Sequence, residues 1–470
     1  MKQTLFFYDL ETSGLSARSQ RIMQFAGQRT DMDLKPLGEP VNIMVKLSDD
    51  ILPDPGAIMV TGITPQKTVE EGYSEPEFCK MLVNDIFTPG TITLGFNNLR
   101  FDDEFIRHTL WRNFYDPYEW AWADERSRWD MLDVVRLVRS LRPDGITWPV
   151  GDDGKSVNKL ELLAKANNLT HTHAHDAMSD VEVLIDLTRL IKQKQPKMFE
   201  YLFKLRDKKA VSRLVDLNNP QAFVYASGRY GSKFEYTTVA YPLSIGPKPN
   251  SILVYDLRYD PGVFAKATPK AMSEVIFASR EQRADPDFIR LPVKELTINK
   301  CPAVAPLGVL DAAAQKRIDL SLDTVRQNLD KLIKLPDFGD RVREAYEMRE
   351  PYAEAGDVEA KLYDSFTPDQ DKPRLAAVRA ADADELADFH PNFSDERLNE
   401  LLLRYKARSF PTSLSQAEQQ AWENYRRGKL MAQIEPYMQA LAKQTELGGD
   451  NFLIDELKLW AESIMPAETD

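Results

Sequence analysis

The chain has 470 residues, of which 43% are hydrophobic and 28% are charged, so it has the composition of a globular protein and is too long for one core. Its 60 basic and 73 acidic residues give a net charge of −13, which excludes a protein that coats nucleic acid through bulk positive charge but permits one local basic channel. No segment is long and apolar enough to cross a bilayer, and the first residues lack the apolar core of a signal peptide. We therefore expect a soluble, cytoplasmic protein of roughly three domains.

The first strong signal is the apolar run at residues 5–14, which reads Leu-Phe-Phe-Tyr-Asp-Leu-Glu-Thr-Ser-Gly. It predicts a buried strand that ends in two carboxylates. Asp9 and Glu11 are two residues apart, so their side chains leave a strand on the same face, and a divalent cation between them would relieve their repulsion. The alternative is a pair of solvated acids at a sheet edge, because D-x-E is a short and common pattern.

The next segments predict the rest of a small sheet and the helix that covers it. Residues 21–30 and 41–47 have the composition of two further strands, which would form a meander with the first, and residues 91–96 predict another strand. A helix then opens at Asp102 and Asp103, where the helix dipole favours negative charge. On its own, this acidic pair would only stabilise the end of a helix.

A third acidic position lies in residues 171–180, which also contain three of the five histidines. Asp176 is a suitable N-cap for the helical run at residues 181–194, which places His175 just before the helix and Asp180 one turn inside it. A histidine in such a loop can reach a site shared with a helical carboxylate, so His175 is a candidate general base.

The motifs D-x-E, N-x-x-F-D and H-x-A-x-x-D, in this order, resemble those of the DEDD exonuclease superfamily in its histidine subclass. The resemblance implies that Asp9, Glu11, Asp102 and Asp180 are the catalytic, metal-binding acids and that His175 takes a proton from the attacking water. The tyrosine subclass has its tyrosine four residues before the last acid, and this chain has Asp176 there.

Longer phrases, at residues 101–104, 112–118, 127–130, 174–178 and 298–302, are similar to one bacterial branch of the superfamily, which degrades single-stranded DNA from its 3′ end. This resemblance implies an α/β multidomain chain. It would comprise an RNase H-like mixed-sheet exonuclease domain at residues 1–195, an SH3-like α+β domain at 196–350 and an all-helical C-terminal domain at 351–470. It also implies release of 5′-mononucleotides by two-metal-ion hydrolysis with Mg²⁺ or Mn²⁺, a role in DNA repair and recombination, and a monomer.

Contacts with the substrate and a partner are predicted on weaker grounds. For the terminal nucleotide the candidates are Thr12, Ser13, Thr61, Ile63, Asn97 and Asn98, each of which has a turn or cap role as its alternative. The resemblance implies that Arg142 and Tyr201 receive the acidic C-terminal tail of the single-stranded-DNA-binding protein, in a pocket where Gln221 stands at a basic position.

Residues 189–213 carry nine basic residues against Glu200 and Asp207, and they are interleaved with aromatic residues. This pattern is typical of a groove that follows a single-stranded backbone, and the alternative is a solvated basic helix beside an aromatic core. Two other functions compete with a DNA exonuclease. An RNA-degrading or proofreading enzyme would need little more than the first 190 residues, and a catalytically silent DNA-binding protein would lack one of the carboxylates.

Overall fold

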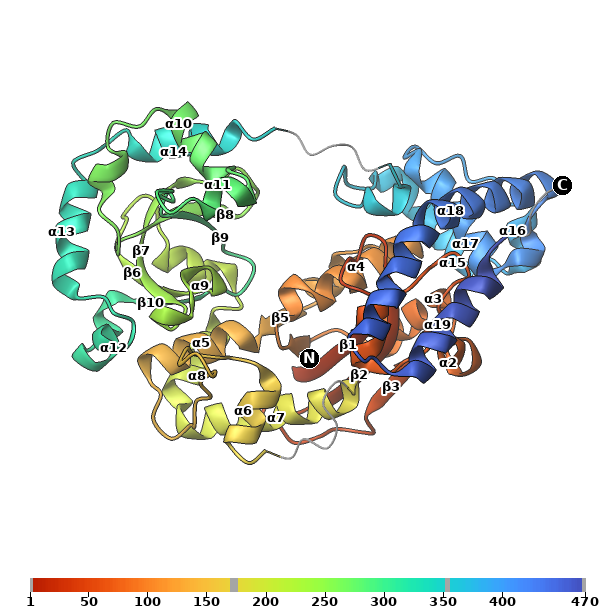
Figure 1. The fold of residues 1–470 in the computed structure, drawn as a ribbon, viewed down its shortest axis with the longest axis horizontal. Helices are drawn as coiled ribbons and strands as arrows, with labels where there is room; N and C mark the ends of the chain where they lie inside the picture. Colours follow the sequence, from red (N-terminus) through yellow and green to blue (C-terminus); the bar gives the residue numbers. More distant parts are fainter. Residues whose placement is uncertain (1–2, 170–175, 351–355, 467–470) are drawn as a thin grey trace. The chain divides into compact units, whose positions relative to one another are not determined.

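The computed structural model describes residues 3–169, 176–350 and 356–466. The chain divides into two compact units (Figure 1). The first unit combines Met1–Ser127, His171–Leu184 and Glu354–Asp470, and the second combines Arg128–Thr170 and Ile185–Ala353. None of the helices in the described ranges combines the length and the hydropathy needed to span a membrane.

The first unit contributes four neighbouring strands, in the order β3-β2-β1-β4. Their bounds are β1 (Thr4–Thr12), β2 (Ile22–Thr30), β3 (Val41–Met44) and β4 (Thr91–Gly95). β1 pairs antiparallel with β2 and parallel with β4, and β2 pairs antiparallel with β3, so the sheet is mixed and the predicted meander is confirmed. A register shift between Glu11 and Thr12 interrupts the β1–β2 pairing where the acidic residues lie. Such bulges re-aim side chains next to active sites.

Helices cover this sheet and also make up the C-terminal part of the unit. Those before residue 127 are α1 (Pro55–Thr61), α2 (Pro65–Glu71), α3 (Glu75–Met81) and α4 (Asp102–Arg112). Those after residue 355 are η8 (Val358–Ala360), α15 (Lys372–Ala380), α16 (Ala383–Ala387), α17 (Arg397–Ser409), α18 (Gln416–Glu446) and α19 (Asn451–Ile464). α2 begins after Thr64, whose hydroxyl accepts from the Lys67 amide, and α4 begins at Asp102 as predicted.

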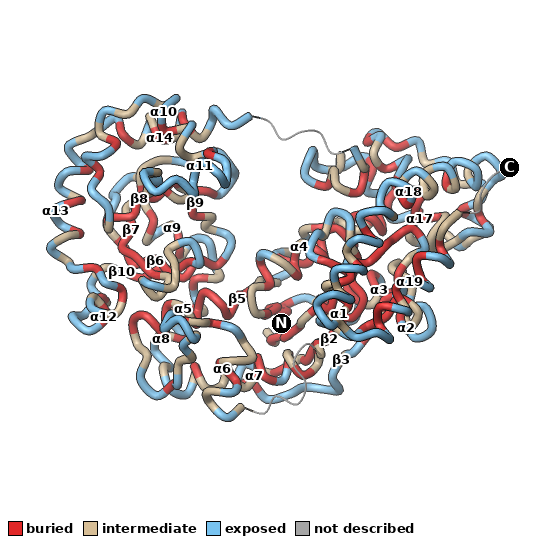
Figure 2. The backbone as a smooth tube through the Cα atoms, in the orientation of Figure 1, coloured by how far each residue is buried: buried red, intermediate tan, exposed pale blue. Residues whose placement is uncertain are grey.

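Three hydrophobic clusters can be described among the buried residues of the first unit, within the part of the chain that the structure describes. Figure 2 shows the buried positions along the backbone in red. One cluster lies between the sheet and α3 and α4 and contains Tyr8 and Phe105. The other two join distant parts of the chain: Met23 and Ile63 pack in one cluster with residues of α18 and α19, and Trp111 packs with residues of α15 and α17. The C-terminal helices therefore share their core with the N-terminal sheet, although the sequence between them is long.

The second unit has an antiparallel sheet of its own, in the order β10-β6-β7-β8-β9. Its strands are β6 (Phe223–Ala226), β7 (Thr237–Ile245), β8 (Ser251–Asp256), β9 (Val293–Thr297) and β10 (Ala303–Pro306); the short strand β5 (Ser127–Asp130) begins at the last residue of the first unit. Its helices are α5 (Met131–Leu141), α6 (Leu160–Ala166), α8 (Pro196–Lys204), α9 (Lys208–Leu214), α10 (Pro269–Ile276), α11 (Arg280–Ala284), α12 (Ala312–Arg317), α13 (Leu322–Leu332) and α14 (Phe338–Glu347). α7 (Ala177–Lys194) begins in the first unit and continues in the second.

The aromatic residues of the basic segment at 189–213 serve mainly as core. Phe199 and Phe203 each contact Trp129 edge-on, with ring centroids 5.2 and 5.1 Å away. The guanidinium of Arg206 lies 3.6 Å from the centroid of Phe203. These contacts favour the aromatic-core interpretation of Phe199 and Phe203 over a row of stacking platforms for DNA bases.

Candidate active site

Three carboxylates converge at the end of β1. Asp9 and Glu11 lie on this strand and Asp180 lies in the first turn of α7, and each offers an oxygen within 4.8 Å of the others. Glu11 is only 9% exposed. Asp102, at the start of α4, is 5% exposed, and its charge acts on both Asp9 and Glu11. The structure thus brings Asp9, Glu11 and Asp180 together as the sequence motifs predict, with Asp102 in electrostatic reach.

The acids destabilise one another's charged forms. Burial, followed by the charges of Asp180 and Asp102, raises the pKa of Glu11 from 4.5 to about 8. Burial and the charges of Asp102 and Glu11 also raise the pKa of Asp9 well above its usual value. Carboxylates that are crowded in this way favour the binding of positive charge.

The donor set fits a divalent cation. Its members are carboxylate oxygens, which hard cations such as Mg²⁺ and Mn²⁺ prefer, and a bound cation would reverse the unfavourable electrostatics of Asp9 and Glu11. Asp9, Glu11 and Asp180 each offer a carboxylate oxygen close enough to the other two for one cation to bind all three. The interpretation of Asp9 and Glu11 as solvated acids at a sheet edge does not agree with the burial of Glu11.

A hydrogen bond that the sequence did not predict connects β1, which carries Asp9 and Glu11, to α4, which begins at Asp102. The Tyr8 hydroxyl of β1 donates to Asp103 Oδ1 of α4 over 2.5 Å, and both side chains are fully buried. Asn98 Nδ2 lies 3.4 Å from the same oxygen. Tyr8 directly precedes Asp9, and Asp103 directly follows Asp102, so this bond fixes the strand and the helix that carry two of the acids. The available signal was Tyr8 at the end of the apolar run, because the hydroxyl of a buried tyrosine needs a hydrogen-bond partner.

Three of the predicted substrate residues make contacts within the protein: Thr12 and Ser13 form hydrogen bonds, and Ile63 is part of a hydrophobic core. Thr12 Oγ1 donates to the Gly14 carbonyl, and Ser13 Oγ donates to Gln20 Oε1 and accepts from the Arg21 amide. Ile63 is 5% exposed and packs in the cluster shared with α18 and α19. These positions agree with the turn and core alternatives that the sequence left open, and a role in DNA binding stays a prediction for each.

The other candidates lie at turns. Thr61 is the last residue of α1, and its hydroxyl accepts from the Ile63 amide. Asn97 has a φ of 71°, a left-handed conformation that asparagine tolerates, and it directly follows Phe96 after β4. Asn98 is fully buried beside Asp103. Their contacts with sugar or phosphate also stay predictions.

His175 lies outside the described residues, whereas its neighbour Asp176 has the predicted role. Asp176 Oδ2 accepts from the Ser179 amide, and its carbonyl accepts from the Asp180 amide, so it caps α7 and fixes the turn that carries Asp180. The general-base role of His175 stays a prediction.

Comparison with known proteins agrees with this geometry over nearly the whole chain. An exonuclease family model matches residues 6–188, a model of the exonuclease I SH3-like domain matches residues 206–348, and a model of the exonuclease I C-terminal domain matches residues 356–464. The exodeoxyribonuclease I of Haemophilus influenzae is 38% identical over 450 residues, which is 95% of each chain. The chain belongs to the exodeoxyribonuclease I family. The Escherichia coli member is 37% identical over 427 residues, which cover 91% of this chain and 90% of that protein.

Solved structures of the exodeoxyribonuclease I family have the same fold. The E. coli enzyme in complex with a dA16 oligonucleotide has a TM-score of 0.95 at 35% identity, over 99% of this chain and 100% of that one. The enzyme from Methylocaldum szegediense has a TM-score of 0.92 at 37% identity, with the same coverage. A zinc-bound form of the E. coli enzyme with single-stranded DNA also matches, with a TM-score of 0.94 at 35% identity over 99% of this chain and 100% of that one. The expected fold class, with a mixed-sheet exonuclease part, an SH3-like part and a helical C-terminal part, is confirmed.

Arg142 and Tyr201, the two residues predicted to bind a partner protein, both contact residues 304–311 of the second unit. Arg142 Nη1 lies 3.1 Å from Asp311 Oδ2, and Arg142 Nη2 donates to the Val309 carbonyl. The Tyr201 hydroxyl donates to the Val304 carbonyl over 3.1 Å, and burial raises its pKa to about 12. Arg142 is 37% exposed, so its side chain is partly accessible to solvent.

Proposed function

We propose that this protein is a 3′-to-5′ exonuclease that hydrolyses single-stranded DNA to 5′-mononucleotides. The observation that carries the proposal is the convergence of Asp9, Glu11 and Asp180 within 4.8 Å, at the position that the family motifs give to catalytic acids. The oligonucleotide complexes of the E. coli enzyme support single-stranded DNA as the substrate. The long chain outside the exonuclease segment argues against an RNA-degrading or proofreading enzyme of minimal size.

We infer that Asp9, Glu11, Asp102 and Asp180 hold two divalent cations, with Mg²⁺ as the expected metal and Mn²⁺ as a substitute. When bound, such cations activate water and stabilise the charge that develops on a phosphodiester. The protein supplies the rest of the chemistry. His175, which directly precedes Asp176 in the sequence, would accept the proton of the attacking water, because histidine is the side chain that most often acts as a general base near neutral pH.

Further proposals concern the contacts and setting of the enzyme. Thr12, Ser13, Thr61, Ile63, Asn97 and Asn98 are the proposed surroundings of the terminal nucleotide. We propose that Arg142 and Tyr201 bind the C-terminal tail of the single-stranded-DNA-binding protein, and the exposure of Arg142 supports this. We also propose domain limits at 1–195, 196–350 and 351–470, a monomer, a cytoplasmic location, and a role in DNA repair and recombination.

A single digestion experiment tests the activity. The purified protein would be incubated with 3′-labelled or 5′-labelled single-stranded DNA, duplex DNA and single-stranded RNA, each with Mg²⁺ and with excess EDTA. We expect early release of the 3′ label from single-stranded DNA only when Mg²⁺ is present, and no release by Asp180→Ala. Loss of the 5′ label first would refute the polarity, equal digestion of RNA would refute the substrate class, and digestion in EDTA would refute the metal dependence.

A further inference from the structure

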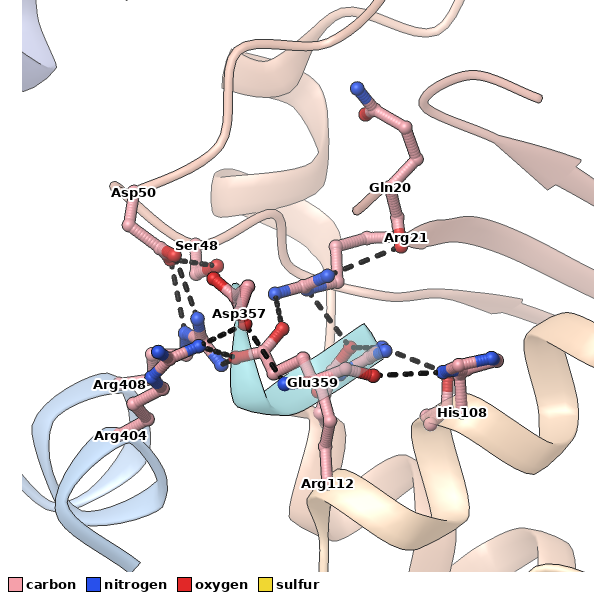
Figure 3. Close-up of polar contacts among 12 residues, drawn as sticks. Gln20, Arg21, Ser48, Asp50, His108, Arg112, Asp357, Glu359, Arg404 and Arg408 are labelled. Atoms are coloured by element: carbon pink, nitrogen blue, oxygen red, sulfur yellow. Dashed lines mark hydrogen bonds and ion pairs between the residues drawn. The ribbon is translucent and has the colours of Figure 1, made fainter. Parts of the chain in front are cut away.

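A network of buried charges joins the C-terminal helices to the N-terminal sheet inside the first unit. Figure 3 shows Arg21, which directly precedes β2, and Arg404 and Arg408, from α17, pointing toward Glu359 of η8. Arg408 also binds Asp50 through two nitrogens, at 3.0 and 2.7 Å, and Lys429 of α18 lies 2.7 Å from the same carboxylate. The network lies apart from Asp9, Glu11 and Asp180, and the mechanism gives it no role.

Glu359 is the acceptor at the centre of this network. One of its oxygens lies 2.5 Å from Arg21 Nη2, and the other lies 2.6 Å from Arg408 Nη1 and 3.3 Å from Arg404 Nη1. Its carboxylate is only 3% exposed. Burial alone would raise the pKa of Glu359, but Arg21 and Arg408 hold it well below the usual range, so Glu359 is ionised. Arg408 also binds Asp50 and Arg404 also binds Asp357, whereas Arg21 has only Glu75, 3.7 Å away, as a further carboxylate among its described ion pairs, so the charge of Arg21 depends most on Glu359.

Arg21 carries this constraint to the strand of catalytic acids. Its guanidinium is fully buried, and Glu359 is its shortest ionic contact, since Glu75 lies 3.7 Å away. Its backbone closes the β1–β2 hairpin: the Ser13 amide donates to the Arg21 carbonyl over 2.9 Å, and the Arg21 amide donates to Ser13 Oγ over 2.8 Å. Ser13 is two residues from Glu11, and the bulge between Glu11 and Thr12 lies directly inside this closure.

We propose that Glu359 is a positioning residue for Glu11, acting through Arg21 and the Arg21–Ser13 closure of the hairpin. The C-terminal helical segment would then help to orient a metal ligand, although none of the proposed ligands lies in that segment. Metal ligands depend on the groups that orient them, and loss of such a group weakens metal affinity on the order of 10-fold or more. The role assigned to Glu359 rests on the proposed metal-dependent function.

The test compares Glu359→Gln with Asp50→Asn. Both changes remove a buried carboxylate that binds Arg408, but the described hydrogen bonds of Asp50 are with Ser48, Arg408 and Lys429, so the control leaves the Arg21 contact in place. Two quantities would be measured on the full chain: the Mg²⁺ concentration for half-maximal digestion of single-stranded DNA, and the Kd for Mn²⁺ by calorimetry without DNA. Both would be measured well below the Tm of each variant, where the folded fraction is close to one, so that lost stability alone does not move the midpoints.

We expect Glu359→Gln to raise both midpoints on the order of 10-fold and Asp50→Asn to change them less than about 2-fold. Arg21→Met should raise the midpoints as much as Glu359→Gln does. The double variant, with Arg21→Met and Glu359→Gln together, should have midpoints no higher than those of the more affected single variant, because both changes break the same chain of contacts. Equal shifts in Glu359→Gln and Asp50→Asn, no shift in Glu359→Gln, or additive losses in the double variant would overturn the proposal.

Two further outcomes have a defined meaning. If Glu359→Gln does not fold, Glu359→Asp keeps the charge on a shorter side chain and should shift the midpoints in the same direction by a smaller factor; unchanged midpoints in that variant would overturn the proposal. If the wild-type protein digests no DNA, the proposed function fails, while the Mn²⁺ calorimetry still decides whether Glu359 positions the acids.

Discussion

The substitution Glu11→Gln should stabilise the protein in the absence of metal while it abolishes activity. It keeps the size of the side chain but removes a charge that burial and the neighbouring acids disfavour. Since the pKa of Glu11 is raised from 4.5 to about 8 in the folded protein, the folded state binds a proton that the unfolded state has already released. Folding stability must therefore fall as the pH rises from about 4.5 to about 8.

The size of this effect follows from the same two pKa values. At pH 7 the linkage amounts to about 3 kcal/mol of lost stability from Glu11 alone, and the raised pKa of Asp9 acts in the same direction. For a unit of this size the loss corresponds to a decrease in Tm on the order of 5–10 °C. Mg²⁺ or Mn²⁺ should reverse it in the wild-type protein, because a ligand that binds only the folded state raises its stability.

Thermal unfolding at several pH values between 5.5 and 8.5, in EDTA and in Mg²⁺, measures each of these effects. In EDTA the wild-type Tm should fall across this range, and Glu11→Gln should show a smaller fall and a smaller gain from Mg²⁺. Glu70→Gln is the matched control, because it removes an exposed carboxylate from α2 of the same unit. If the Tm of Glu11→Gln falls with pH as steeply as that of the wild-type protein, or rises as much on addition of Mg²⁺, the charges of the acids do not destabilise the fold in the way described.

Three other predictions follow from the sites. Tyr8→Phe leaves the buried Asp103 without its 2.5 Å donor and should lower the free energy of unfolding by about 1–3 kcal/mol, measured by urea denaturation of the full chain; an unchanged midpoint would show that the bond contributes nothing. Asp180→Ala and His175→Ala should each lose most hydrolysis of single-stranded DNA while DNA binding, measured by fluorescence anisotropy in EDTA, stays close to the wild-type value; near-normal turnover in either variant would contradict its catalytic role. Arg142→Ala should weaken binding of an acidic tail peptide, whereas Asp311→Asn should tighten it a few-fold by freeing the guanidinium; titration of a labelled peptide measures both, and no change in either variant would remove Arg142 from the peptide site.

Much of the catalytic part could be predicted because its signals are local. The apolar run before Asp9 and Glu11 forms β1, the acidic pair opens α4 at Asp102, and Asp176 caps the helix of Asp180. Strand periodicity and helix capping depend on residues a few positions apart, so they were enough to predict the elements that carry the acids, whereas the meeting of these acids at one site was implied by the resemblance to the DEDD exonucleases. The distances between those acids and the burial of Glu11 came only with the structure.

Contacts between residues far apart in the chain could not be predicted. Tyr8 and Asp103 are separated by 95 positions, and Arg21 and Glu359 by 338. Their pairing depends on how whole elements pack, and no local pattern in the sequence encodes it. The C-terminal helices do have local signals of their own, such as the capping box in which Ser415 and Glu418 open α18. Tertiary structure alone decided that these helices share a core with the first sheet, because burial of apolar surface is non-directional and complementary packing selects the partner.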